Sequence, residues 1–429
     1  MKISGLCSGL RGATTVPGDK SISHRAVMLG AVAEGKTVIT GFLSGEDCLA
    51  TIDCFRKMGV SIVQDGNTVI VQGVGLYGLQ EPAVALYAGN SGTTIRLLLG
   101  ILAGQHFVAT ISGDDSIKRR PMGRVVKPLR QMGANISSEM APLTVAPAET
   151  LAGFHYEMPI ASAQVKSALL LAGLYAQGVT NVTEPARSRD HTEIMLQAFG
   201  VPVQRQGLTV AVTGGHSLRG KRIAVPGDIS SAAFLIVAAL IIPGSEIVLH
   251  RIGINPTRTG ILDVLVSMGA DITVTPYTTA GEPVADIAVR YSKLTGTVVA
   301  GDLIPRLIDE IPVLAVAAAF ASGTTVISDA AELKVKESNR IAAMVTGLAA
   351  MGADVEEQAD GMVIRGGKPL TGAVIASAGD HRIAMSFAIA GLAAANETVI
   401  NGDDCIPVSF PGFSATLREL GVTIATESD

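Results

Sequence analysis

Cationic and hydroxyl side chains gather immediately before an apolar run near the start of the chain. The stretch VPGDKSISHRAVMLGA (16–31) begins with a Pro-Gly-Asp turn and then places Lys20, Ser21 and Arg25 at the start of the run. Gly and Pro favour a turn, and Ser or Asp beside an apolar run indicates the start of a helix. Because a helix start carries unpaired N–H groups and a partial positive charge, these residues suit a phosphate or a carboxylate. The alternative is a solvated loop leading into a core helix.

Comparable polar residues precede other apolar runs farther along the chain. They are Asn90, Gly92 and Arg96; Ser162, Ala163, Gln164 and Lys166; Arg306, Asp309 and Glu310; and Asp380, His381 and Arg382. The NSGTT turn (90–94) can cradle an oxyanion, because glycine lets a ligand approach the backbone, although it also fits an ordinary helix cap. The run KRRPMGR (118–124) holds four cations in seven residues. It forms either a solvated face or a clamp for a doubly charged anion.

Carboxylates stand beside cations at two of these predicted helix starts. The stretch VKESNR (335–340) places Lys336, Glu337 and Arg340 before an apolar run, which suits an anion and a proton donor together. An ion pair between Glu337 and Arg340, three residues apart on a helix, is the alternative. Asp309 precedes another run, where it either favours the helix N-terminus or serves as a general base.

The elements that must position these residues follow one repeating pattern. Six apolar runs predict helices at 25–33, 94–103, 165–176, 232–243, 311–321 and 382–395. Each run is followed by a Thr/Val/Ile-rich segment that predicts a strand. A second helix then ends at an apolar residue followed by Gly59, Gly133, Gly200, Gly269, Gly352 or Gly421. Glycine just beyond a helix is the usual stop signal, so the chain predicts six copies of one unit.

The repeats divide the chain into halves. The sequence VPGD at 16–19 returns at 225–228, each time before an apolar run. Three units in each half favour two similar domains over a solenoid, and we expect them at residues 14–225 and at 1–13 plus 226–429. If the starts of the central helices face one another, the charged groups converge in an interdomain cleft, which is a preferred place for small-molecule sites.

Composition excludes several classes of protein. Of 429 residues, 48% are hydrophobic and 17% charged, yet the longest apolar run (232–243) falls short of the ~20 residues of a membrane-spanning helix. We therefore expect buried helices in an α/β protein with no membrane association. A net charge of −5 argues against a nucleic-acid binder. The first residues, MKISGLCSG, contain no apolar segment of a signal peptide, so we expect a cytoplasmic protein.

The collected motifs closely resemble the 5-enolpyruvylshikimate-3-phosphate synthase family over essentially the whole chain. The matching stretches are PGDKSISHR (17–25), GNSGTTIRLLLG (89–100), RRPMGR (119–124), ASAQVKSALLLAGL (161–174), SRDHTE (188–193), IDEIPVLAVAAAFA (308–321), VKESNRI (335–341) and GDHRIAMSFAI (379–389). The resemblance implies two domains, each of three βαβαββ-type units in an inside-out α/β barrel. It implies a transferase of the shikimate pathway, in chorismate and aromatic amino acid biosynthesis. Such an enzyme moves the enolpyruvyl group of phosphoenolpyruvate to the 5-hydroxyl of shikimate 3-phosphate and releases phosphate. It would act as a monomer without metal or organic cofactor.

The resemblance also implies roles for individual residues. Those similar to the family's shikimate 3-phosphate contacts are Lys20, Ser21, Arg25, Ser162, Ala163, Gln164, Arg189, Asp309 and Lys336. Those similar to its phosphoenolpyruvate contacts are Lys20, Gly92, Arg120, Gln164, Arg340 and Arg382. Asp309 resembles the base that takes the 5-hydroxyl proton, and Glu337 resembles the group that protonates the methylene carbon. Lys20 completes the implied catalytic set.

Two positions concern how far the family pattern extends. Many members carry a Lys before a Ser/Thr-Phe-Pro step near the C-terminus, where this chain has Val408. The motifs SAQVK and SRDH lean toward a branch that includes glyphosate-tolerant enzymes, whereas Gly92 is usual in sensitive forms. The resemblance therefore makes glyphosate a candidate inhibitor.

Two alternatives stay open on the sequence alone. UDP-N-acetylglucosamine enolpyruvyl transferase shares the fold and the donor, but it usually carries a Lys-Asn pair and a loop Cys. Here Lys20 is followed by Ser21, and residues 111–121 contain no Cys. The second alternative is a non-catalytic repeat protein that binds an anionic metabolite.

Overall fold

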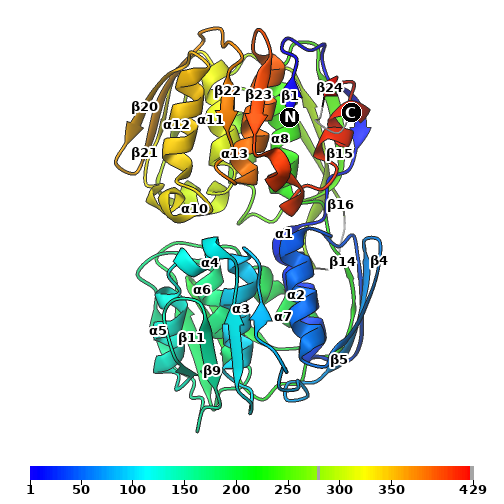
Figure 1. Cartoon of the computed structure of the whole chain (residues 1–429), viewed down its shortest axis with the longest axis vertical. Coiled ribbons are helices and arrows are strands. Elements are labelled where there is room, and N and C mark those ends of the chain that lie inside the picture. Colours follow the sequence, from blue (N-terminus) through cyan, green and yellow to red (C-terminus); the bar gives the residue numbers. More distant parts are fainter. Residues whose placement is uncertain (278–280, 426–429) are drawn as a thin grey trace. The chain divides into compact units, whose positions relative to one another are not determined.

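The chain folds into two compact units, shown in a computed structural model that describes residues 1–277 and 281–425 (Figure 1). One unit comprises Gly18–Val225, and the other comprises Met1–Pro17 together with Pro226–Asp429. Both mix helices with four-stranded sheets, which confirms the predicted α/β class. Among the residues described, no helix has the length and apolar character needed to cross a membrane.

Strands of the first unit form three sheets of one design. Their orders are β14 (Arg222–Ala224), β3 (Glu34–Thr40), β5 (Thr68–Val74), β4 (Ser61–Asp65); β6 (Leu86–Tyr87), β7 (Ala109–Ser112), β9 (Leu143–Ala146), β8 (Asn135–Ile136); and β10 (His155–Glu157), β11 (Val179–Thr183), β13 (Thr209–Thr213), β12 (Val203–Gln206). In each sheet the first two strands are parallel and the other neighbours antiparallel. The strand β14, which follows the third repeat, pairs with β3 of the first repeat and so connects the two ends of the unit.

The second unit repeats this design. Its sheets have the orders β16 (Asp271–Tyr277), β17 (Val284–Arg290), β15 (Glu246–Gly253), β2 (Arg11–Thr14); β18 (Val298–Val299), β19 (Gly323–Ile327), β21 (Gly361–Gly366), β20 (Asp354–Gln358); and β22 (Val374–Ala376), β23 (Thr398–Asn401), β1 (Lys2–Ile3), β24 (Ile424–Ala425). Each sheet again contains one parallel pair. The first residues of the chain supply β1 and β2 to this unit.

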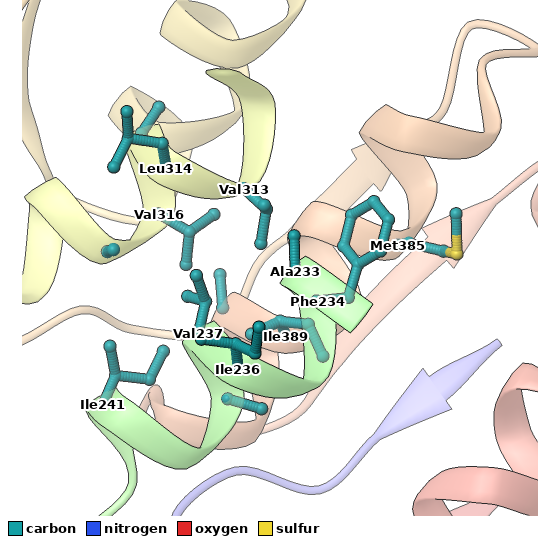
Figure 2. Close-up of a cluster of buried hydrophobic side chains, with 14 of the residues drawn as sticks. Ala233, Phe234, Ile236, Val237, Ile241, Val313, Leu314, Val316, Met385 and Ile389 are labelled. Atoms are coloured by element: carbon teal, nitrogen blue, oxygen red, sulfur yellow. The ribbon is translucent and has the colours of Figure 1, made fainter. Parts of the chain in front are cut away.

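The six predicted apolar helices lie at the centres of the two units. They are α1 (Lys20–Val32), α3 (Gly92–Leu102) and α6 (Ala163–Gly173) in the first unit, and α8 (Ile229–Ile241), α11 (Ile311–Phe320) and α13 (His381–Ala393) in the second. Every residue of α8 is buried. Figure 2 shows its Phe234 and Val237 beside Val316 of α11 and Ile389 of α13. Burying each such side chain stabilises the fold by roughly 1.5–3 kcal/mol.

A second helix is present in each repeat. They are α2 (Glu46–Lys57), α5 (Gly123–Gln131), α7 (His191–Ala198), α9 (Gly260–Ser267), α12 (Arg340–Ala350) and α14 (Phe413–Glu419). The glycine beyond each of them has a positive φ between 86° and 103°, which confirms the predicted stop signals. Short helical segments complete the chain: α4 (Asp115–Arg119), α10 (Ile304–Leu307), η1 (Gly301–Leu303), η2 (Ala331–Val335) and η3 (Asp403–Val408).

The repeated VPGD motif has one structural role in both units. Asp19 caps α1 by accepting a hydrogen bond from the Ile22 N–H at 2.9 Å. Asp228 caps α8 in the same way, with the Ser230 N–H at 2.8 Å. Because each cap fixes the first turn of a central helix, the side chains that follow it are held at the helix start.

Candidate active site

Contacts among the first turns of α1, α2 and α3 bring their starts together in the first unit. Lys20, the first residue of α1, forms an ion pair with Asp47 in the first turn of α2. The Thr94 hydroxyl of α3 donates to the Asp47 carbonyl at 3.3 Å. Lys20 keeps 17% of its side chain exposed, so its ammonium group lies at the surface of this junction.

Arg25 joins α1 to α6 and α7. Its guanidinium donates from Nε to Thr192 Oγ1 at 2.6 Å and from Nη2 to Ser167 Oγ at 2.7 Å. Its Nη1 donates to the Ser21 carbonyl at 2.9 Å. Arg25 is only 4% exposed, so the structure places this predicted anion contact inside the unit.

His24 lies on the inner side of the same helix. Its Nδ1 is 2.7 Å from Thr51 Oγ1, and the ring is fully buried. Burial first, and then the charges of Lys20 and Arg25, lower the pKa of His24 well below its ordinary value. The imidazole is therefore neutral near pH 7 and leaves the positive charge of this region to the two cations.

Gly92 opens helix α3 next to two arginines. A Cβ atom added at Gly92 would lie 2.9 Å from Arg96 Nη1 and 3.1 Å from Arg120 Nη2. Arg96 donates to Gln164 Oε1 of α6 at 2.7 Å, which ties the starts of α3 and α6 together. The buried Nε of Arg120 has no hydrogen-bond partner within residues 1–277 and 281–425. Two guanidinium groups beside a glycine, one of them with an unsatisfied Nε, suit an oxyanion.

The start of α6 contains two further predicted contacts. Ser162 caps the helix by accepting from the Val165 N–H at 3.4 Å, and Ala163 is its first residue. Gln164 also donates to Thr93 Oγ1 at 3.1 Å. Arg189 is half-buried in the loop that leads into α7.

Lys166 does not join this group, although its position near a helix start suggested it. It is fully buried and contacts Glu184 and Glu193. It lies three residues beyond the helix start, on the face that packs against the interior.

In the second unit Arg340 forms ion pairs with three carboxylates. Its Nη1 lies 3.2 Å from Asp309 Oδ1, and its Nη2 lies 2.6 Å from Glu337 Oε2. Its Nε donates to Asp380 Oδ2 at 2.8 Å. Nη1 and Nη2 thus contact the candidate base and the candidate acid, Asp309 and Glu337. The Nε atom contacts Asp380, which is fully buried. The predicted ion pair between Glu337 and Arg340 is present, and it forms part of this larger cluster.

Burial and charge act in opposite directions on this cluster. Burial alone would lower the pKa of Arg340, but the charges of Asp380, Glu337 and Asp309 raise it above its ordinary value. Burial likewise works to raise the pKa of Asp380, yet the charge of Arg340 keeps that pKa below its usual range. Both groups of the Arg340–Asp380 pair therefore stay charged at neutral pH.

Lys336 and Arg382 complete the cluster. The Lys336 ammonium lies 3.7 Å from Asp309 Oδ1. Arg382 donates from Nη1 to the Asp309 carbonyl at 3.0 Å. Asp380 caps α13 by accepting from the Arg382 N–H at 2.9 Å, so the buried partner of Arg340 also fixes the start of the helix that carries Arg382.

Two other candidates from the sequence face elsewhere. Glu310 is 1% exposed and accepts a hydrogen bond from the Ser230 hydroxyl, with Arg258 at 3.7 Å. Arg306 pairs with Asp263 at 2.6 Å, away from the Arg340 cluster. Val408 is the last residue of η3, and its apolar side chain is 7% exposed.

Two residues of these contacts were not predicted from the sequence, and a third was predicted without a role. Asp47 pairs with Lys20, and Thr192 accepts from Arg25, although neither was singled out. Asp380 was noted only as a residue near a helix start. An acidic residue in the first turn of α2 was the available signal for Asp47, but the partner of each residue is far away in the chain.

Six α/β repeats with cations and paired carboxylates at their helix starts define an anion-binding α/β enzyme. The chain belongs to the EPSP synthase family: the family model described as EPSP synthase (3-phosphoshikimate 1-carboxyvinyltransferase) matches residues 7–417. Such a match over nearly the whole chain confirms the resemblance found in its motifs.

Individual relatives agree with the family assignment. A 3-phosphoshikimate 1-carboxyvinyltransferase of Pelotomaculum thermopropionicum is 60% identical over 424 residues, covering 97% of this chain and 98% of the relative. One of Desulforudis audaxviator is 59% identical, covering 96% of this chain and 97% of the relative. The solved EPSP synthase of Acinetobacter baumannii matches with a TM-score of 0.89 and 49% identity over 99% of this chain and 98% of that one. These findings favour the synthase over the sister transferase and the non-catalytic protein.

Proposed function

We propose that this chain transfers the enolpyruvyl group of phosphoenolpyruvate to the 5-hydroxyl of shikimate 3-phosphate and releases phosphate. The observation that carries the proposal is the Arg340 cluster, in which Asp309 and Glu337 lie against the two outer nitrogens of one guanidinium. The family assignment supplies the names of the substrates.

The chemistry requires an acid and a base that are held apart. Addition of the hydroxyl oxygen to C2 of phosphoenolpyruvate requires one proton removed from that hydroxyl and one delivered to C3. Asp309 accepts the first proton and Glu337 delivers the second. Loss of the C3 proton and of phosphate from the resulting tetrahedral adduct then restores the double bond. Lys20 and Lys336 supply positive charge to the phosphate groups and to the adduct.

Arg340 couples ligand binding to these two carboxylates. A planar guanidinium binds a carboxylate through two parallel hydrogen bonds. The contact between Arg340 Nη2 and Glu337 Oε2 measures 2.6 Å. When the carboxylate of phosphoenolpyruvate takes this position, Glu337 is released to carry a proton. Asp380 keeps its hold on Nε and so preserves the orientation of the guanidinium.

We propose that side chains of the first unit serve the same two substrates. For shikimate 3-phosphate they are Lys20, Ser21, Arg25, Ser162, Ala163, Gln164 and Arg189. For phosphoenolpyruvate they are Lys20, Gly92, Arg120 and Gln164. The unsatisfied Nε of Arg120 and the two guanidinium groups that approach Gly92 closely support the second set.

The test is phosphate release from phosphoenolpyruvate with one of two acceptors. We expect release with shikimate 3-phosphate and none with UDP-N-acetylglucosamine. Release only with the nucleotide sugar would assign the chain to the sister reaction. Binding of both ligands without any release would leave a non-catalytic anion-binding protein.

The finer expectations belong to the same proposal. We expect a cytoplasmic monomer, which sedimentation velocity of the purified chain tests for oligomeric state. We also expect glyphosate to compete with phosphoenolpyruvate, since it presents an anion to the same cations. Titration of the phosphate-release assay with glyphosate tests this expectation.

A further inference from the structure

A buried ion cluster lies behind the loop that carries Arg189. Lys166 Nζ is 2.7 Å from Glu184 Oε2 and 2.8 Å from Glu193 Oε1. The side chain of Lys166 is 0% exposed, and those of both glutamates are 3% exposed. None of these three residues belongs to the substrate contacts proposed above.

The cluster forms hydrogen bonds with Ser188, the residue that precedes Arg189. Glu184 Oε1 accepts hydrogen bonds from the Ser188 hydroxyl and from the Ser188 backbone N–H, the latter at 3.3 Å. Lys166 Nζ also donates to the Ser188 carbonyl at 3.4 Å. The N–H, the carbonyl and the hydroxyl of Ser188 are therefore all fixed by two side chains.

The same cluster also contacts Asp190, the residue after Arg189, through Arg205. Arg205 Nη1 lies 3.1 Å from Asp190 Oδ2, and Arg205 Nη2 lies 3.4 Å from Glu193 Oε1. Asp190 is 7% exposed and Ser188 is 4% exposed, whereas Arg189 between them is half-buried. The backbone on both sides of Arg189 is thus held from within the unit.

Stability alone gives little reason for such a cluster. Removing charges from water is costly, and well-packed apolar residues of similar volume are often as stabilising as a buried ion pair. A charged cluster differs from an apolar one because its hydrogen bonds fix particular atoms in particular positions. Here the fixed atoms are those of the loop.

We propose that Lys166, Glu184 and Glu193 are positioning residues that hold Arg189 for the phosphate group of shikimate 3-phosphate. This inference rests on the proposed function, which assigns Arg189 to that phosphate. Residues that orient a ligand-binding group from behind determine how well it binds. The cluster therefore sets the preference of the chain for a phosphorylated acceptor over the same acceptor without phosphate.

Glu184→Gln is the sharpest variant. Its amide presents one oxygen and one NH₂ group where Glu184 presents two acceptors. The NH₂ group must then face either the Lys166 ammonium or the Ser188 N–H, both of which can only donate. The variant keeps the ion pairs of Lys166 with Glu193, of Arg205 with Glu193 and Asp190, and of Arg187 with Asp190, so it should fold.

The measurement is calorimetric binding of shikimate 3-phosphate and of shikimate to the intact chain. We expect Glu184→Gln to weaken shikimate 3-phosphate about tenfold, the size of effect that outer hydrogen-bond partners have at metal sites, and shikimate by less than about twofold. Val182→Ala, which removes buried methyl groups from the same stretch of chain, controls for lost stability. It should lower the melting temperature and leave the preference between the two ligands unchanged.

A second background shows whether the effect passes through Arg189. In an Arg189→Ala chain, Glu184→Gln should change shikimate 3-phosphate binding by less than about twofold, because the two changes share one interaction. If Glu184→Gln weakens shikimate 3-phosphate binding about tenfold in the Arg189→Ala chain as well, the inference is overturned. It is also overturned if Glu184→Gln alone weakens the binding of shikimate 3-phosphate and of shikimate equally. If Arg189→Ala alone leaves shikimate 3-phosphate binding unchanged, the assignment of Arg189 fails and this inference fails with it. The phosphate-release assay of the unchanged chain tests the reaction independently.

Discussion

Asp309→Asn separates binding from catalysis at the Arg340 cluster. The amide has the same shape as the carboxylate, and its oxygen can still accept from Arg340 Nη1, which lies 3.2 Å from Asp309 Oδ1. Arg340 also keeps its contacts with Glu337 at 2.6 Å and with Asp380 at 2.8 Å, so the local structure should persist. What the variant lacks is a group that accepts the 5-hydroxyl proton.

The expected size of the effect follows from the role assigned to Asp309. General base catalysis contributes typically about 10²–10⁴-fold, equivalent to about 2.7–5.5 kcal/mol in the activation free energy. We therefore expect kcat to fall by that factor. The KM for phosphoenolpyruvate should stay unchanged or decrease, because one negative charge has been removed beside an anionic substrate.

Phosphate release at saturating substrates gives kcat, and calorimetry gives binding of phosphoenolpyruvate. Asp263→Asn is a matched control in the same unit, since Asp263 is 53% exposed and pairs with Arg306 at 2.6 Å. It should leave both quantities unchanged. Turnover of Asp309→Asn within about threefold of the unchanged chain would refute the role of Asp309 as the base, since that loss is far below the range for a missing base.

Gly92→Ala should raise the KM for phosphoenolpyruvate several-fold in the phosphate-release assay, because the new Cβ would meet Arg96 Nη1 at 2.9 Å and Arg120 Nη2 at 3.1 Å; an unchanged KM would show that these guanidiniums do not bind the donor. Burial lowers the pKa of His24, so the unfolded chain binds a proton that the folded chain does not, and stability should fall by up to about 1.4 kcal/mol per pH unit below about pH 6.5. Urea unfolding at pH 7, 6 and 5 measures this, and His24→Gln should reduce the slope; an equal slope in both chains contradicts the assignment. Lys166→Met removes the ammonium group from buried Glu184 and leaves Glu193 with Arg205, so it should cost about 3–5 kcal/mol in urea unfolding, whereas a loss below about 1 kcal/mol would contradict a buried charge cluster.

Periodicity and end signals predicted the helices of this fold well. Each of the six apolar runs overlaps one central helix and extends slightly beyond its end, and glycine follows each second helix with a positive φ, as at Gly59 and Gly352. These signals are local, because a helix is closed by hydrogen bonds between residues close in sequence. The repeat of VPGD likewise identified two equivalent caps, at Asp19 and Asp228.

The sequence did not predict which strands pair with one another. The sheet that contains β3 is completed by β14, which lies more than 180 residues later in the chain. The short strands β1 and β2 join sheets of the second unit from the first residues of the chain. No local pattern specifies such partners, since pairing depends on which edges the packed helices leave adjacent.

The residue types of the candidate site could be predicted from the sequence, but the direction in which each side chain points could not. Asp309, Glu337 and Arg340 meet as their residue types suggested, because they all lie at helix starts. Lys166 also lies near a helix start, yet it points inward to Glu184. The face on which a side chain lies depends on its turn within the helix, and buried acceptors far away in sequence decide whether a charge can be buried there.

Mass spectrometry of the products formed from phosphoenolpyruvate and shikimate 3-phosphate shows whether this chain transfers the enolpyruvyl group. We predict one product that joins the enolpyruvyl group to shikimate 3-phosphate, formed in equal amount to the phosphate released, with the unchanged and Asp309→Asn chains differing only in rate. Shikimate 3-phosphate recovered unchanged while phosphoenolpyruvate is consumed, or recovery of both substrates intact, would contradict it.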